Sequence, residues 1–242
     1  MTAAPAGDGD ARVVFHAHAG IASWVAASAA AIAEALCRDL LLQARSRLLL
    51  SGGTTPAPVY AALARLPLAW ERVDVALVDE RWLLPDDPDS NAWLVRDALL
   101  QQGAGDARFE PMTRPGRGLA DAVAAANLQA RQPPAVVVLG MGEDGHTASL
   151  FPRMRGFDDA RASTAPYVTV DATGCAGAGR WERRISLTPA GLAPAAARML
   201  LIRGARKREL LDKVLAGDDA REYPVRLAYS TPGAPLQVHW CP

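Results

Sequence analysis

Short runs of aliphatic residues alternate along the chain with longer segments in which apolar residues recur every three or four positions. Runs of the first kind are typical of strands, and the longer segments are typical of helices. The pattern predicts strands at 12–16, 46–50, 73–78, 135–139, 167–170, 184–187, 199–202 and 236–240. It predicts helices at 20–43, 56–65, 90–100, 119–131 and 205–215. Because such alternation favours parallel strands joined by right-handed crossovers, we expect an α/β protein with a mostly parallel sheet flanked by helices.

No linker divides the chain, so we expect a single domain over residues 12–242 that follows a disordered tail at 1–11. An apolar run at 20–33 is the nearest approach to a membrane segment. Glu34 and Arg38 interrupt it before the roughly 20 apolar residues that a span requires. No cluster of positive residues precedes it, as a signal peptide would need. We therefore expect a core-facing helix and no membrane partner.

Composition narrows the class of protein. The 242 residues include 26 basic and 26 acidic side chains, and no basic tract stands out, which argues against a nucleic-acid partner. All basic residues except Lys207 and Lys213 are arginines. The three cysteines are widely spaced and odd in number, which suits neither a disulfide framework nor a zinc ribbon. We expect a protein of the reducing cytoplasm.

In an open parallel sheet, ligands bind beyond the carboxyl ends of the strands. The first unusual loop there is Ser-Gly-Gly-Thr-Thr-Pro at 51–56. Its glycines allow backbone N–H groups to face a ligand, its hydroxyls add donors, and a helix N-terminus follows, which together suit a phosphate. No Walker lysine follows the glycines, which argues against a nucleoside triphosphate. An ordinary strand-to-helix turn remains an equal interpretation of this spacing.

Two further loops follow strands. Asp79, Glu80 and Arg81 come directly after 73–78, where charges are costly unless they pair or face a cleft. Arg81 can contact a phosphate through two N–H groups, and Asp79 can hold sugar hydroxyls or a proton. A local ion pair explains them equally well. Within 203–207 a predicted strand ends and a predicted helix begins. A cation in the first turn of that helix is unfavourable unless an anion lies nearby.

The fourth loop, at 140–149, contains the pattern GxGxxG. Pro152 follows too soon for the sustained helix of a dinucleotide site, so we favour another interpretation. His146 stands on this tight turn beside Glu143 and Asp144, where imidazole can take a proton from water and a carboxylate can fix its tautomer. We interpret the remaining histidines as structural: His16, His18 and His239.

Five ordered motifs give the chain a family resemblance. They are SGGTTP at 51–56, DERxxxP at 79–85 followed by Ser90-Asn91, LGMGEDGHTASLFP at 139–152, RISLT at 184–188, and Gly204-x-x-Lys207. With these motifs the chain resembles the 6-phosphogluconolactonases, within the wider family that includes the glucosamine-6-phosphate deaminases. The resemblance runs over roughly 12–240. It implies a modified Rossmann-like fold, no redox cofactor and no obligatory metal.

The resemblance also implies an activity, which is hydrolysis of 6-phospho-D-glucono-1,5-lactone to 6-phosphogluconate in the oxidative pentose phosphate pathway. His146 would activate water against the C1 carbonyl, and Asp79 and Asp144 would orient the sugar or the imidazole. Asn91 and loop N–H groups are candidate donors to the oxyanion, and Arg184 is expected to approach the ligand. The residues expected to hold the phosphate are Gly52, Gly53, Thr54, Thr55, Arg81 and Lys207.

Two alternatives stay open. Deaminases of the family carry a glutamate where this chain has Phe151, which cannot move a proton, and this argues against glucosamine-6-phosphate deaminase/isomerase activity. A non-catalytic sugar-phosphate-binding protein would be expected to lack His146, which is present. We expect a small-molecule sugar-phosphate lactone as the ligand, in a monomer or a small homo-oligomer.

Overall fold

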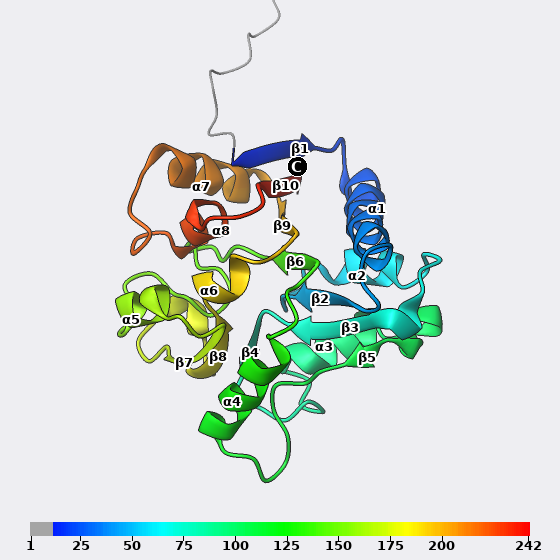
Figure 1. Cartoon of the computed structure of the whole chain (residues 1–242). Helices are drawn as coiled ribbons and strands as arrows, with labels where there is room; N and C mark the ends of the chain where they lie inside the picture. Colours follow the sequence, from blue (N-terminus) through cyan, green and yellow to red (C-terminus); the bar gives the residue numbers. More distant parts are fainter. Residues whose placement is uncertain (1–11) are drawn as a thin grey trace, which may run out of the picture.

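Seven parallel strands form the main sheet of the computed structural model, which describes residues 12–242. The strand order is β1-β10-β9-β6-β2-β3-β5 (Figure 1). Their bounds are β1 Val13–Ala17, β2 Ser46–Leu50, β3 Val73–Leu77, β5 Arg108–Phe109, β6 Val136–Leu139, β9 Ala197–Arg203 and β10 Leu236–Cys241. Every residue of β2, β3 and β6 is buried, as strands covered on both faces require. The predicted α/β class is confirmed. The tail expected at 1–11 lies outside the described residues.

Helices cover both faces of this sheet. Right-handed crossovers place α1, α2 and α3 on one face, and α4, α6 and α7 on the other (Figure 1). Their bounds are α1 Ile21–Leu40, α2 Ala57–Leu63, α3 Asn91–Ala98, α4 Leu119–Gln129, α5 Phe157–Ala162, α6 Pro189–Leu192, α7 Ala205–Ala216 and α8 Leu227–Ser230. Ser90 caps α3 by accepting a hydrogen bond from the N–H of Trp93 at 2.9 Å, as its position before an apolar segment predicts.

Helix α1 is long and apolar enough to cross a membrane by length and composition, the one such helix among the described residues. Its inner face nevertheless belongs to the core, since Trp24, Ile32 and Leu36 have no exposed surface. The prediction of a core-facing helix is confirmed.

The segment 79–81 is a strand and not a loop, so that expectation was wrong. It forms β4 (Asp79–Arg81), which pairs antiparallel with β8 (Arg183–Leu187), and β8 pairs antiparallel with β7 (Tyr167–Asp171). The sequence pattern located β7 and β8 as strands but gave no sign of this second, three-stranded sheet. Three charged residues in a row conceal β4, because apolar alternation is the usual mark of a strand.

Val78 joins the two sheets. Its N–H donates to the carbonyl of Leu50 in the main sheet at 2.9 Å, and its carbonyl accepts from the N–H of Leu187 in the small sheet at 2.8 Å. The chain therefore passes from β3 into β4 with hydrogen bonds on either side. This junction places the side chains of β4 at the carboxyl end of the main sheet.

Candidate active site

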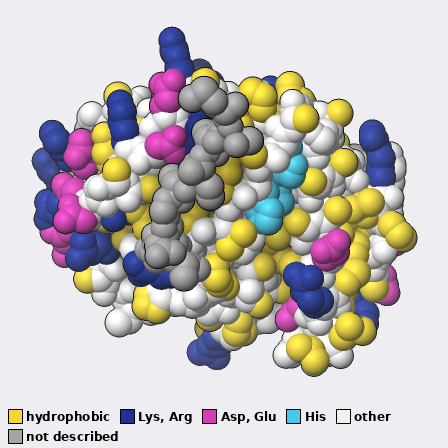
Figure 2. All heavy atoms as spheres, turned by 90° about the horizontal axis from the view of Figure 1, so that it is seen from above, with side chains coloured by type: hydrophobic (Ala, Val, Ile, Leu, Met, Phe, Trp, Pro, Cys, Tyr) yellow, Lys and Arg dark blue, Asp and Glu magenta, His cyan; other side chains and the backbone are white. Residues whose placement is uncertain are grey.

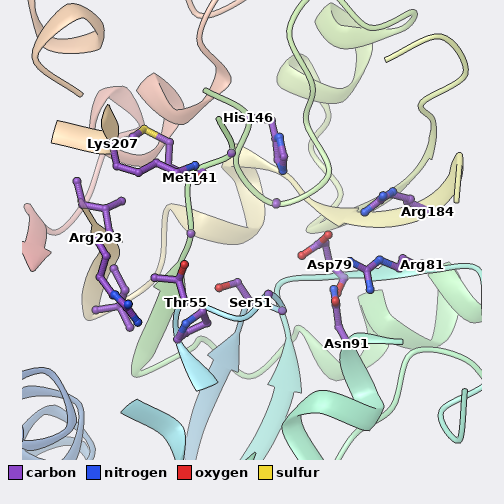
Figure 3. Close-up of a pocket in the computed structure, with 18 residues that line it drawn as sticks. Ser51, Thr55, Asp79, Arg81, Asn91, Met141, His146, Arg184, Arg203 and Lys207 are labelled. Carbon is purple, nitrogen blue, oxygen red and sulfur yellow. Dashed lines mark hydrogen bonds between the residues drawn. The ribbon is translucent and has the colours of Figure 1, made fainter. Parts of the chain in front are cut away.

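A cavity of about 180 Å³ lies beyond the carboxyl ends of β2, β3, β6 and β9 (Figure 3). Its walls come from five parts of the chain: the loop after β2, strand β4 with the start of α3, the loop after β6, strand β8, and the β9–α7 junction. This is where an open parallel sheet binds its ligands. Most residues predicted for the site line it: Gly52, Gly53, Thr55, Asp79, Arg81, Asn91, His146, Arg184 and Lys207.

Two predicted residues do not line the cavity. Thr54 is exposed and does not line the cavity, although its neighbours Gly53 and Thr55 do. Asp144 lies behind His146 and reaches the cavity only through that imidazole.

His146 and Asp144 form a hydrogen-bonded pair. The His146 Nδ1 lies 2.6 Å from Asp144 Oδ1, and the same oxygen accepts from the His146 backbone N–H at 3.1 Å. Burial raises the pKa of the Asp144 carboxyl, but the hydrogen bond and charge of His146 outweigh it and leave the pKa below its ordinary value. An ionised carboxylate only accepts, so Nδ1 carries the proton. The Nε2 atom is left with a lone pair that can take a proton.

Two glycines permit this pair to pack closely. A Cβ atom at Gly142 would lie 2.1 Å from His146 Nδ1, and one at Gly177 would lie 2.4 Å from Asp144 Oδ2. Gly177 belongs to η3 (Ala176–Ala178), a short 3₁₀ turn that covers the carboxylate. Any side chain at either position would displace the pair. The motif at 139–152 marks the first of these loops in the sequence, while no motif marks the second.

Strand β4 sends its side chains in alternate directions. Asp79 and Arg81 line the cavity, while Glu80 points the opposite way, as strand geometry requires. Asp79 Oδ2 accepts a hydrogen bond from the hydroxyl of Ser149 at 2.6 Å, and its carbonyl accepts from the Asn91 amide at 2.8 Å. Ser149 therefore fixes the carboxylate, and Asn91 fixes the backbone that carries it. Ser149 was not among the predicted site residues.

Glu80 is fully buried and holds the start of α3. Its carboxylate accepts from the backbone N–H groups of Arg81, Asn91 and Ala92, each at 2.8 Å. Burial raises the pKa of Glu80 to about 7, against the opposing effect of these three donors. Because Asn91 is the first residue of α3, this carboxylate sets the position of the Asn91 side chain in the cavity. Strand alternation would have revealed it, had 79–81 been recognised as a strand.

The cations form two groups. Arg81 and Arg184 are cross-strand partners on β4 and β8. The Arg184 guanidinium is held by the carbonyls of Trp181 at 2.9 Å and Ala178 at 2.6 Å. Figure 3 shows this pair on one side of the cavity and Lys207 and Arg203 on the other, with His146 between them. Contact of Arg81 and Lys207 with a single phosphate therefore stays a prediction.

On the opposite side, Lys207 donates to the carbonyl of Met141 at 2.6 Å and lies 3.4 Å from Glu143 Oε1. Beside it, the loop after β2 offers unused donors. Among residues 12–242, the backbone N–H groups of Gly52 and Gly53 have no hydrogen-bond acceptor. A cation and free N–H groups together suit an oxyanion.

The remaining histidines lie elsewhere. His16 and His18 on the β1 side stack on His239, with ring centroids 4.6 and 5.4 Å apart, and none of the three lines the cavity. Figure 2 shows histidine side chains gathered on that face among hydrophobic neighbours. Burial, followed by the charges of His16 and His18, lowers the pKa of His239 to about 4. Within the described residues, no group of three or more His, Cys, Asp or Glu side chains has an arrangement that could hold a metal ion.

Fold and cavity together define an α/β protein suited to an anionic small molecule beside a histidine–aspartate pair. A family model described as glucosamine-6-phosphate isomerases/6-phosphogluconolactonase matches residues 21–240, and the chain belongs to this family. The 6-phosphogluconolactonase of Xylella fastidiosa (strain 9a5c) is 48% identical over 234 residues, which cover 96% of this chain and 98% of that protein.

Solved structures agree with this assignment. A crystal structure of a 6-phosphogluconolactonase from Shewanella baltica OS155 has a TM-score of 0.86 and 29% identity, covering 97% of this chain and 100% of that one. A monomeric glucosamine-6-phosphate deaminase has a TM-score of 0.75 and 19% identity, covering 94% and 96%. The second likeness shows a shared fold alone, so the choice between the two activities depends on the residues of the site.

Proposed function

We propose that this chain hydrolyses 6-phospho-D-glucono-1,5-lactone to 6-phospho-D-gluconate, a step of the oxidative pentose phosphate pathway. The observation that carries the proposal is the His146–Asp144 pair, whose free Nε2 lies between two groups of cations in one cavity. The relative at 48% identity that bears the name of this activity supports it.

The two cation groups match the two anionic ends of the product. Lys207 and the N–H groups of the loop after β2 hold the phosphate. The resemblance assigns Arg81 to the phosphate, but Arg81 lies beside Arg184 across the cavity from Lys207, so we assign both arginines instead to the carboxylate that hydrolysis creates. Between them, Asp79 accepts hydrogen bonds from the sugar hydroxyls, since Ser149 fixes its carboxylate and Asn91 fixes its backbone carbonyl.

Catalysis begins with a water molecule between His146 and the lactone carbonyl. The Nε2 atom of His146 takes a proton from this water molecule while the water oxygen forms a bond to C1. The product of this step is a tetrahedral oxyanion. The second N–H of the Asn91 amide, which does not bond to Asp79, and nearby loop N–H groups are the donors proposed for this charge. The bond from C1 to the ring oxygen then breaks, and His146 returns its proton to that oxygen. Asp144 stabilises the imidazolium throughout.

Phe151 argues against the deaminase alternative. It is fully buried and its ring lies 4.6 Å from that of His146, in the place where the deaminases of the family carry a glutamate. The Arg184 guanidinium lies 5.2 Å from the same ring. An apolar ring in this position keeps the imidazole in place and transfers no proton.

Acid release from freshly prepared 6-phosphogluconolactone tests the proposal, with ammonia release from glucosamine 6-phosphate as the control reaction. We expect hydrolysis well above the spontaneous rate and no deamination. Hydrolysis at the spontaneous rate would leave the non-catalytic sugar-phosphate-binding protein as the better description. A cytoplasmic location and a monomeric or small homo-oligomeric state belong to the same proposal, and size-exclusion chromatography with light scattering measures the latter.

A further inference from the structure

Arg203 is a cation of the cavity to which no role has been assigned. It is the last residue of β9, four positions before Lys207, and its side chain lines the same cavity. Figure 3 shows both residues on one side, with Arg203 extending toward the loop that contains Ser51 and Thr55. The cavity wall on this side therefore carries two positive charges.

The Arg203 guanidinium lacks an anionic partner. Among residues 12–242 it forms no hydrogen bond or ion pair, although it is half-buried. It lies over the ring of Trp24, 5.9 Å from the centroid. Trp24 is fully buried and its Nε1–H donates to the carbonyl of His239 at 3.0 Å, so the ring is a fixed support. A half-buried cation with unused donors is unfavourable unless a ligand supplies the acceptors.

Charge balance points to the nature of that ligand. A phosphate monoester carries close to two negative charges at neutral pH. The charge of Lys207 is partly offset by Glu143, whose Oε1 lies 3.4 Å from its ammonium group. Lys207 alone therefore leaves a bound phosphate under-neutralised, and Arg203 supplies the missing positive charge. Its planar guanidinium also offers paired N–H donors that match two phosphate oxygens.

We propose that Arg203 is a second cationic ligand of the substrate phosphate and sets the preference for phosphorylated over unphosphorylated lactones. This inference rests on the proposed function for its substrate class. The inference itself requires only that Arg203 and Lys207 bind a phosphate group together.

Calorimetric titration with inorganic phosphate tests this binding without any catalytic readout. We expect Arg203→Ala to weaken phosphate binding roughly tenfold to a hundredfold, as loss of a charge-assisted hydrogen bond does. Arg203→Met keeps the volume of the side chain and should show the same loss, while Arg203→Lys should recover part of the affinity. Arg206→Ala is the matched control, because Arg206 is exposed and does not line the cavity.

Kinetics supply the second readout. The ratio of kcat/KM for 6-phosphogluconolactone to that for glucono-1,5-lactone should fall by the same factor in Arg203→Ala, mainly through KM, because the unphosphorylated lactone does not use Arg203. Unchanged phosphate affinity in Arg203→Ala and Arg203→Met would overturn the inference, as would failure of the parent protein to bind phosphate. A parent that binds phosphate but hydrolyses neither lactone would refute the proposed function and leave the calorimetric result on Arg203 standing.

Discussion

A single methyl group at position 177 should disable the proposed histidine–aspartate pair without unfolding the protein. In Gly177→Ala, the added Cβ would lie 2.4 Å from Asp144 Oδ2 and 3.0 Å from His146 Nδ1. The backbone φ of Gly177 is negative, so alanine fits the turn itself. The carboxylate must move by about 1 Å before the contact reaches the ordinary 3.4 Å. That movement takes Asp144 away from the position that gives the 2.6 Å bond to His146.

A misplacement of about 1 Å in a catalytic group costs on the order of 10²-fold in rate. We therefore expect kcat for lactone hydrolysis to fall about a hundredfold in Gly177→Ala. The KM should change little, because the proposed phosphate ligands lie on other loops. Stopped-flow measurement of acid release gives both constants, and ¹⁵N chemical shifts of the imidazole report its tautomer. Ala176→Ser is the control, since Ala176 is exposed in the same turn.

The reasoning fails if Gly177→Ala keeps kcat within twofold of the parent and the imidazole keeps its Nδ1–H tautomer. That result would mean that the turn at Ala176–Ala178 yields at no cost and does not position Asp144.

Three other outcomes are expected. His146→Gln should lower kcat by a factor on the order of 10² to 10⁴ with little change in KM, and near-normal turnover would place the general base elsewhere. Lys207→Ala should raise KM and weaken inhibition by inorganic phosphate, and equal inhibition in variant and parent would remove Lys207 from the phosphate site. The pKa of His239 is about 4 in the folded protein against 6.5 for free imidazole, so the unfolded chain takes the proton first. The contribution of neutral His239 to the free energy of unfolding should therefore be fully present above pH 6.5. It should fall by about 3 kcal/mol as the pH drops to 4. Urea unfolding at several pH values measures this loss. If the free energy of unfolding of His239→Asn fell with pH as steeply as that of the parent protein, the prediction would be contradicted.

The centre of the main sheet was predictable because strands β2, β3 and β6 are buried along their whole length, whereas the two-residue edge strand β5 was not predicted. The segments 46–50 and 73–77 are mostly aliphatic and buried along their whole length, although they include Arg47 and Asp74, which leaves few alternatives for the chain. The small sheet was not predictable for the opposite reason. Asp79 and Glu80 have hydrogen-bond partners from elsewhere in the chain, and those partners make burial of the two charges acceptable. No local pattern in the sequence indicates a strand whose side chains are stabilised in this way.

Most of the predicted site residues line one cavity, but the prediction left out residues that support them. Motifs located His146 and Lys207 because the chemistry demands particular side chains at particular turns. Ser149 and Gly177 escaped notice because their importance lies in contacts with residues far along the chain. Thr54 was included by its adjacency to Thr55, although successive residues of a turn point in different directions.

The junction at Val78 gives the cavity a fixed length. The chain there cannot bend without losing the bond to Leu50 in one sheet or the bond from Leu187 in the other. The phosphate side of the cavity is built on the main sheet, while Arg81 and Arg184 belong to the small one. The spacing between the two anion-binding ends is therefore set before any ligand arrives. Under the proposed function, the cavity therefore selects substrates by the distance between their carbonyl and phosphate groups. A lactone with a shorter carbon chain between these groups would reach only one end of the cavity at a time.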